Sequence, residues 1–382
     1  MFFAAGFDRE ETNNRYKITV QIPNPLSMNS GGGRGTTVEG GGKKDNSKVI
    51  SAIGKSFYDA GNNLTVKSTR EINFTHTGIT LFSEKLAREG LSPALDFLDR
   101  ERQFRPISLA FVVDGGDLRK AMEAEFEMEE YGARGIRRHQ QITVERNPVT
   151  IITALQEIYN WLSRPGQEIA LPRLHLIDLS ANGIGDGQDS GGDEELSMES
   201  PMQLSGLAAF KKDRLVGWLN EQEARGYALI TNKAKRITYV IESPPPFKGN
   251  FTVEVFEIRT KKEVKITDNR VTIIIKITAA GRIHETTSHE DWLSRDSQLI
   301  DSINKRLAEA LRKDVQSALD KAQKKLQTDI FGFGNLIYRT LPREWEALAP
   351  QWDELYPVVE VQVDVNAEIR RTGLLRAPGR IR

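Results

Sequence analysis

The chain lacks cysteine altogether in its 382 residues, which excludes disulfides, thiolate metal sites and a cysteine nucleophile. No apolar run approaches the roughly 18 residues of a membrane-spanning helix. Net charge is absent as well, because 53 Lys and Arg balance 53 Asp and Glu. No overall field therefore draws the chain to nucleic acid or anionic lipid. With 28% charged and 38% hydrophobic residues, the composition is typical of a soluble globular protein.

Catalytic and metal-binding motifs are also missing. Neither a GxSxG nor an HExxH motif occurs. The Gly-rich segment 31–44 lacks the Lys-Ser or Lys-Thr of a phosphate loop, and the acidic residues of 186–195 lack EF-hand spacing. The five histidines, His76, His139, His175, His284 and His289, are not spaced for a shared metal. We therefore expect no enzyme activity, no cofactor and no bound metal.

The most specific local pattern is GLAAFKKDRLVGWL, residues 206–219. Two apolar segments flank a polar turn, which predicts a β-hairpin followed by a helix from Asn220. Phe210 and Trp218 are expected to pack as a cross-strand pair, and Gly217 to permit a bulge or a close approach. Loop tips on a rigid scaffold often carry recognition. The turn is therefore a candidate for partner contact, through Lys211, Lys212, Asp213 and Arg214.

Strand and helix patterns alternate up to residue 181 and predict an N-terminal α/β domain over 1–181. Alternating apolar residues indicate a strand at Tyr16–Ile22, and a continuous apolar run indicates a covered strand at Ile107–Val113. A helix is expected over Ser47–Gly61 and a strand over Leu64–Phe74.

The rest of the chain is divided by composition. An acidic, Gly-rich linker covers 182–203, and a small middle domain, 204–246, ends at a polyproline-like break. The segment 247–371 is predicted to form an antiparallel meander, with turns at Asp268-Asn269 and Ala280-Gly281, packed by one long helix over about 296–329. A basic tail covers 372–382. The predicted fold is thus mixed α+β with three domains.

Aromatic residues gather after the long helix, at Phe331, Phe333, Trp345 and Trp352. A binding surface is one interpretation. The other, which the glycines among them favour, is the cap of a core.

Several blocks occur in an order that resembles one protein family. They are YKITVQIPNP (16–25), EKLAREGLSPALDFLDRE (84–101), the hairpin block, DIFGFG (329–334), the pair Trp345 and Trp352, and RRTG (370–373). Together they resemble the GerAC-type (Ger(x)C) C subunits of nutrient germinant receptors in endospore-forming bacteria, over nearly the whole chain.

The resemblance implies a three-domain lipoprotein on the outer face of the spore inner membrane, beside two integral membrane subunits. Members begin with a signal peptide and a lipid-modified cysteine, with palmitate as an expected acyl group. Both are missing here, and residues 1–8 resemble the interior of the family's first strand. We therefore expect a truncated, soluble chain whose parent protein carries the anchor.

Three functions follow as hypotheses. The first is a non-enzymatic receptor subunit that assembles with its membrane partners, with germinant contact left open. The second is a peptidoglycan hydrolase that uses Glu221 and Glu223 as its catalytic pair. The spacing argues against it, because residues two apart on a helix point to different faces. The third is a stand-alone extracytoplasmic protein that binds a small molecule in a pocket between domains.

Overall fold

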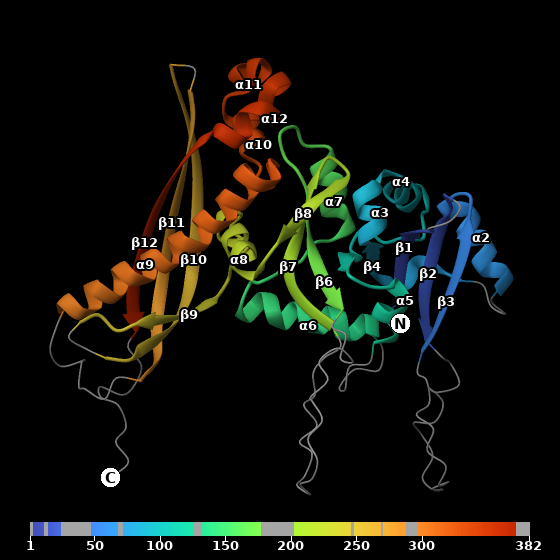
Figure 1. The fold of residues 1–382 in the computed structure, drawn as a ribbon, viewed down its shortest axis with the longest axis horizontal. Helices are drawn as coiled ribbons and strands as arrows, with labels where there is room; N and C mark the ends of the chain where they lie inside the picture. Colours follow the sequence, from blue (N-terminus) through green and yellow to red (C-terminus); the bar gives the residue numbers. More distant parts are fainter. Residues whose placement is uncertain are drawn as a thin grey trace, which may run out of the picture.

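The computed structural model describes residues 3–10, 14–23, 47–67, 72–124, 132–176, 202–245, 248–268, 270–287 and 297–371. Two sheets form the molecule (Figure 1): one with strand order β3-β2-β1-β4-β5-β6-β7-β8, the other with order β12-β11-β10-β9. The prediction of a mixed α+β fold is confirmed. The Gly-rich segment 31–44, nearly all of the acidic linker and the basic tail lie outside the described residues.

The eight-stranded sheet has a parallel centre with antiparallel flanks. Its strands are β1 (Phe3–Arg9), β2 (Tyr16–Pro23), β3 (Ser47–Gly54), β4 (Thr77–Ser83), β5 (Leu109–Asp114), β6 (Ala170–Leu176), β7 (Met202–Lys211) and β8 (Arg214–Leu219). Strands β1, β4, β5 and β6 run parallel, while β2, β3, β7 and β8 pair antiparallel. The central β5 is an unbroken apolar run because helices cover both faces of the sheet.

Helices of the N-terminal half divide between these two faces. One core contains α2 (Phe57–Lys67), α3 (Glu84–Glu89), α4 (Ser92–Arg100) and α7 (Leu155–Leu162). The other core contains α5 (Leu118–Glu123) and α6 (Gly132–Arg146). The short helix η1 (Phe74–His76) precedes β4.

Two sequence predictions in this half are wrong. The helix expected over Ser47–Gly61 is instead β3 followed by α2, and the strand expected over Leu64–Phe74 begins inside α2. Apolar spacing alone did not separate the strand from the helix. β3 forms as a strand because its backbone pairs with β2, which is distant in the sequence. Buried Phe57, Ala60 and Leu64 carry the true helical spacing.

The predicted hairpin is confirmed as β7 and β8, with Lys211 paired to Arg214 and only Lys212 and Asp213 between them. A bulge sets Ala208 opposite Trp218 and Phe210 opposite Leu215, so the expected cross-strand pair Phe210–Trp218 is wrong. Gly217 makes the expected close approach, since a Cβ there would lie 2.6 Å from Cδ2 of Leu326.

The hairpin that begins the predicted middle domain lies in the N-terminal sheet, where β7 pairs with β6. It is followed by α8 (Glu221–Ile230), which packs against the C-terminal half. The division into domains at 181, 203 and 246 stays a prediction. The largest apolar core is continuous across this region, from Ala170 and Leu207 to the residues of the C-terminal sheet.

The four-stranded sheet is built around one long hairpin. Its strands are β9 (Ile237–Glu242), β10 (Asn250–Thr267), β11 (Arg270–Thr286) and β12 (Glu360–Arg371). Strands β9, β10 and β11 are antiparallel as expected, whereas β12 runs parallel to β11. No turn forms at Ala280-Gly281, because these residues pair with Phe256 and Val255 inside the continuous hairpin.

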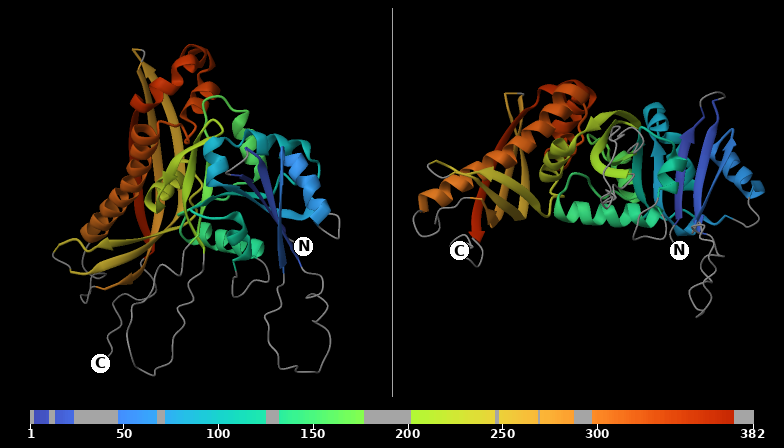
Figure 2. Two further views of the ribbon diagram at one scale, coloured as in Figure 1. Left: turned by 45° about the vertical axis from the view of Figure 1, so that its right-hand side comes forward. Right: turned by 60° about the horizontal axis from the view of Figure 1, so that its bottom comes forward.

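The long helix α9 (Ser297–Leu319) crosses one face of this sheet, as the sequence predicts, and continues into a π-helical segment, η2 (Asp320–Leu326). A cap of short helices follows (Figure 1): α10 (Phe333–Thr340), α11 (Pro342–Leu348), η3 (Ala349–Gln351), α12 (Trp352–Leu355) and η4 (Tyr356–Val358). Figure 2 shows from two further sides that this cap lies at one end of the four-stranded sheet.

Among the described residues, no helix combines the length and apolarity needed to cross a membrane. The aromatic residues of the cap, Phe331, Phe333, Trp345 and Trp352, are all buried. They therefore complete a core, which is the second of the two interpretations given above.

Candidate functional site

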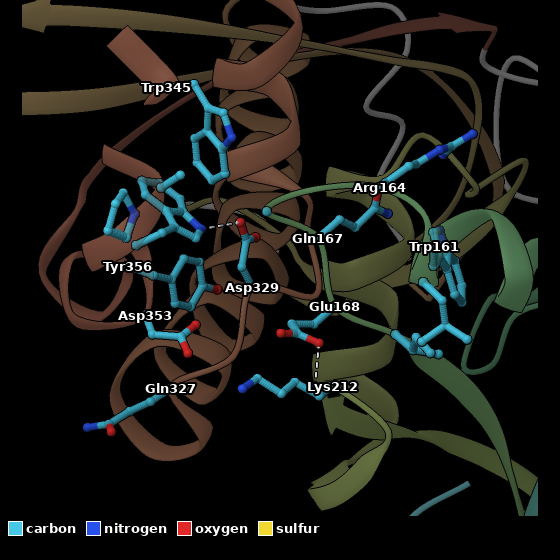
Figure 3. Close-up of a pocket in the computed structure, with 16 residues that line it drawn as sticks. Trp161, Arg164, Gln167, Glu168, Lys212, Gln327, Asp329, Trp345, Asp353 and Tyr356 are labelled. Atoms are coloured by element: carbon cyan, nitrogen blue, oxygen red, sulfur yellow. Dashed lines mark hydrogen bonds between the residues drawn. The ribbon is translucent and has the colours of Figure 1, made fainter. Parts of the chain in front are cut away.

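A cavity of about 380 Å³ lies where the N-terminal sheet meets the C-terminal cap (Figure 3). We call it the seam pocket. From the N-terminal half it is lined by the end of α7, residues 164–169 and Lys212; from the C-terminal half it is lined by residues between 327 and 356. Both halves thus contribute walls to one site.

Residues 164–169, here called the seam loop, join α7 to β6 and are held by the C-terminal half. The amide of Asn335 donates to the carbonyl of Gly166 at 2.8 Å, and the amide of Glu168 donates to the carbonyl of Asp329 at 3.0 Å. Gly166 has φ +64°, and a Cβ there would lie 2.5 Å from the ring of Trp345. Glycine is therefore the residue that this contact requires.

Asp329 anchors the start of α10 from within the core. Its carboxylate accepts hydrogen bonds from the amides of Phe333 (3.0 Å) and Gly334 (2.8 Å), and from the indole N–H of Trp352 (3.1 Å). Burial raises the pKa of Asp329 to about 6, although these three donors act in the opposite direction. The side chain therefore serves as a helix cap, with both oxygens occupied.

Glu168 faces the pocket from the seam loop. Its Oε2 accepts a hydrogen bond from the amide of Lys212 at 2.6 Å, shown as a dashed line in Figure 3. Burial raises the pKa of Glu168 to about 7, and the nearby charges of Asp353 and Asp329 add to the shift. The Lys212 amide and the side chain of Lys211 oppose it.

The raised pKa of Glu168 links stability to pH. The folded chain holds a proton on this group up to about pH 7, whereas an unfolded Glu releases it near the ordinary value of 4.5. The folded state therefore binds more protons in this window, and the free energy of unfolding decreases as the pH rises through it. We expect the free energy of unfolding, measured with urea, to decrease less between these two pH values in Glu168→Gln than in the unaltered protein. The same change at the exposed Glu344 is the control, and equal pH profiles for all three proteins would contradict this assignment.

Tyr356 brings an unpaired polar group to the pocket. The residue is only 1% exposed, and its hydroxyl has no hydrogen-bond partner among the described residues. In Figure 3 the hydroxyl points toward the side on which Asp329 and Glu168 lie, whereas the guanidinium of Arg164 points away from them. Buried hydroxyls are normally hydrogen-bonded, so this one is an exception that calls for an explanation.

The π-helical segment η2 supports the same wall. Gln323 lies in it, and its Nε2 donates to the carbonyls of Tyr356 and Val359, each at 3.0 Å. The residue that caps its C-terminal end, Gln327, has a left-handed backbone with φ 51° and lines the pocket. Such π-helical turns are frequent at functional sites.

Three of the four residues in the turn of β7 and β8 are held within the molecule, Lys212 through its amide and Lys211 and Asp213 through their side chains. Oδ2 of Asp213 accepts a hydrogen bond from the hydroxyl of Ser92 at 2.6 Å and from its amide at 3.2 Å, at the start of α4, where Leu91 supplies no side-chain cap. Nζ of Lys211 lies 3.5 Å from Oδ2 of Asp353. Lys212 and Arg214 are nevertheless exposed, and Lys212 also lines the seam pocket.

The other candidates from the sequence do not form a site. Glu223 and Asn220 make a capping box at the start of α8, and Oε1 of Glu221 accepts a hydrogen bond from Gln203. Among the described residues no group of three His, Asp or Glu side chains is placed to hold a metal, and His289 lies outside them.

The sequence predictions missed the seam pocket. Glu168 and Tyr356 lie far apart in the chain, and neither belongs to a motif. No local pattern marks Asp329 either, because it lies three residues before Gly332, the N-cap of α10.

Comparison with known proteins gives matches over nearly the whole chain. The family described as "Spore germination protein N-terminal domain" matches residues 1–176, and that described as "Spore germination B3/ GerAC like, C-terminal" matches residues 205–373. Both confirm the resemblance drawn from the sequence blocks.

Individual relatives agree with this assignment. Spore germination protein KC of Bacillus subtilis (strain 168) is 28% identical, over 98% of this chain and 90% of its own. Spore germination protein GerQC of Bacillus cereus is 22% identical, over 97% and 91%. The crystal structure of the GerBC protein shares the fold, with a TM-score of 0.58 at 18% identity over 97% of this chain and 98% of that one. The chain belongs to the GerAC family of spore germination proteins.

Proposed function

We propose that the chain is a non-enzymatic subunit of a spore nutrient germinant receptor that acts by assembling with two integral membrane subunits. The observation that carries the proposal is the family match, which covers both halves of the chain. The lack of a catalytic motif in the sequence, and the structural use of Glu223 and Asp329 as helix caps, favour binding over bond chemistry.

The parent protein would lie on the outer face of the spore inner membrane, held by a lipid on an N-terminal cysteine. This placement rests on the family resemblance.

The turn residues Lys212 and Arg214 are proposed as partner contacts, because both are exposed on a turn that Asp213 holds rigidly. We expect the double variant Lys212→Glu and Arg214→Glu to lower the recovery of the membrane subunits on the tagged full-length protein by at least about tenfold, since reversed charges at an interface cost several kcal/mol and about 1.4 kcal/mol already gives a factor of ten. Recovery is measured by affinity purification from detergent-solubilised spore inner membranes.

The matched control is Lys265→Glu and Lys261→Glu, two exposed lysines of β10. Unchanged recovery with the turn variant would remove the turn from the interface but leave the receptor role standing. Absence of both membrane subunits from the unaltered protein would instead contradict that role.

The alternative is a stand-alone extracytoplasmic protein that binds a small molecule, and the seam pocket is the observation in its favour. Nutrient binding by the purified chain, combined with no membrane partners in the spore, would support this alternative.

A further inference from the structure

The seam pocket holds two independent features that point to a ligand. One is the Tyr356 hydroxyl, which is buried and has no partner among the described residues. The other is the meeting of three carboxyl groups, of Glu168, Asp329 and Asp353, at one cavity of about 380 Å³. That volume lies in the range of small-molecule sites.

Charges of both signs surround the cavity, because Lys212 and Arg164 line it together with the three carboxyl groups, although the guanidinium of Arg164 points away from Asp329 and Glu168 in Figure 3. Lys211 lies 3.5 Å from Asp353, and Lys262, whose Nζ donates to the carbonyl of Phe331, lies close enough to Asp329 to influence its charge. Oε2 of Glu168 accepts one hydrogen bond, from the amide of Lys212. Its other oxygen has no hydrogen bond within the described residues and is available to a donor.

We propose that the seam pocket binds a small molecule that carries a primary ammonium group and a neighbouring hydrogen-bonding group. The ammonium binds the carboxylate of Glu168, and the second group pairs with the hydroxyl of Tyr356. The indole rings of Trp345 and Trp352, which also line the cavity, supply aromatic walls of the kind that favour organic cations. The inference rests on the pocket and not on the receptor role.

Such a ligand would join the two halves of the molecule. Glu168 comes from the seam loop of the N-terminal half and Tyr356 from the cap of the C-terminal half. Binding of a cation favours the charged form of Glu168, whose pKa is otherwise raised. Affinity should therefore increase as the pH rises from about 6 to about 8, where the carboxyl group no longer has to lose a proton on binding.

The test is isothermal titration calorimetry of the chain with three ammonium probes, 2-aminoethanol, glycinamide and 1,4-diaminobutane, at up to about 20 mM, which detects millimolar affinity. The uncharged 1,2-ethanediol is the control probe. We expect saturable binding of at least one ammonium probe, tighter at pH 8 than at pH 6, and none of the diol. Failure of all three probes to bind, or equal binding of the diol, would overturn the proposal.

Three variants assign the site. Glu168→Gln should abolish binding and its pH dependence. Tyr356→Phe should weaken binding of 2-aminoethanol about tenfold, as expected for the loss of one hydrogen bond, without lowering the urea midpoint, because the hydroxyl that it removes has no protein partner. Glu344→Gln, on the exposed side of α11, should bind as the unaltered protein does. Binding that survives both pocket variants would place the ligand elsewhere and contradict the proposal.

Discussion

Replacing Gly226 by alanine is expected to destabilise the protein by about 1–3 kcal/mol, the usual cost of overpacking a close-packed interior. Gly226 lies in the middle of α8, where that helix crosses α9. A Cβ there would lie 2.0 Å from the carbonyl oxygen of Asp314 and 2.7 Å from Cβ of Ala318. Because the nearest atom belongs to the backbone of α9, the two helices must separate to admit the methyl group.

Separation would also disturb a buried polar group at the same crossing. Asp314 is 2% exposed; its carboxylate accepts a hydrogen bond from Arg225 at 2.9 Å and from the hydroxyl of Tyr239 at 2.7 Å. A buried carboxylate that loses such partners is strongly destabilising. The loss at Gly226 is therefore expected toward the upper end of the stated range.

Gly61→Ala is the matched control, since Gly61 also lies inside a helix, α2. A Cβ at Gly61 meets only the side chain of Ile18, at 4.0 Å, and alanine is favoured over glycine in a helix by about 0.5–1 kcal/mol. The change in the free energy of unfolding, measured with urea, should thus have opposite signs for the two substitutions. A stabilising Gly226→Ala would show that α8 and α9 do not pack as described.

The second large effect is expected at Asp329. Asp329→Ala leaves three donors, the amides of Phe333 and Gly334 and the indole of Trp352, without their acceptor in the core. Each unsatisfied buried donor costs about 1–3 kcal/mol, so we expect a loss of at least about 3 kcal/mol of unfolding free energy. Asp329→Asn keeps one acceptor oxygen and should lose less.

A double-mutant cycle tests this explanation. Trp352→Phe removes the indole donor, so Asp329→Ala should cost less in that background than in the unaltered protein. Additive losses would mean that the hydrogen bond between Asp329 and Trp352 contributes nothing to stability.

Local patterns predicted a large part of the fold. The hairpin 206–219 forms because its apolar arms and polar turn are encoded within a few residues. The long helix follows from apolar residues every three or four positions, such as Ile303, Leu307 and Leu311, all of which are fully buried.

Nonlocal pairing escaped prediction for a physical reason. β12 runs parallel to β11 because of the position in which the chain leaves the cap. The residues of β12 themselves do not specify β11 as its parallel neighbour. The seam pocket depends on the same kind of information. Glu168 reaches Asp329 because Asn335 and Trp345 hold the seam loop, through contacts between residues about 170 positions apart in the chain.

The central claim is that this chain serves a receptor assembled in the membrane. The measurement that tests it most directly is affinity purification of the tagged, full-length parent protein from detergent-solubilised spore inner membranes, followed by mass spectrometry of what remains bound. The account predicts that two polytopic membrane subunits are recovered, and that they are lost when the cysteine proposed to carry the lipid is replaced. A protein that is recovered alone even with that cysteine in place would contradict it.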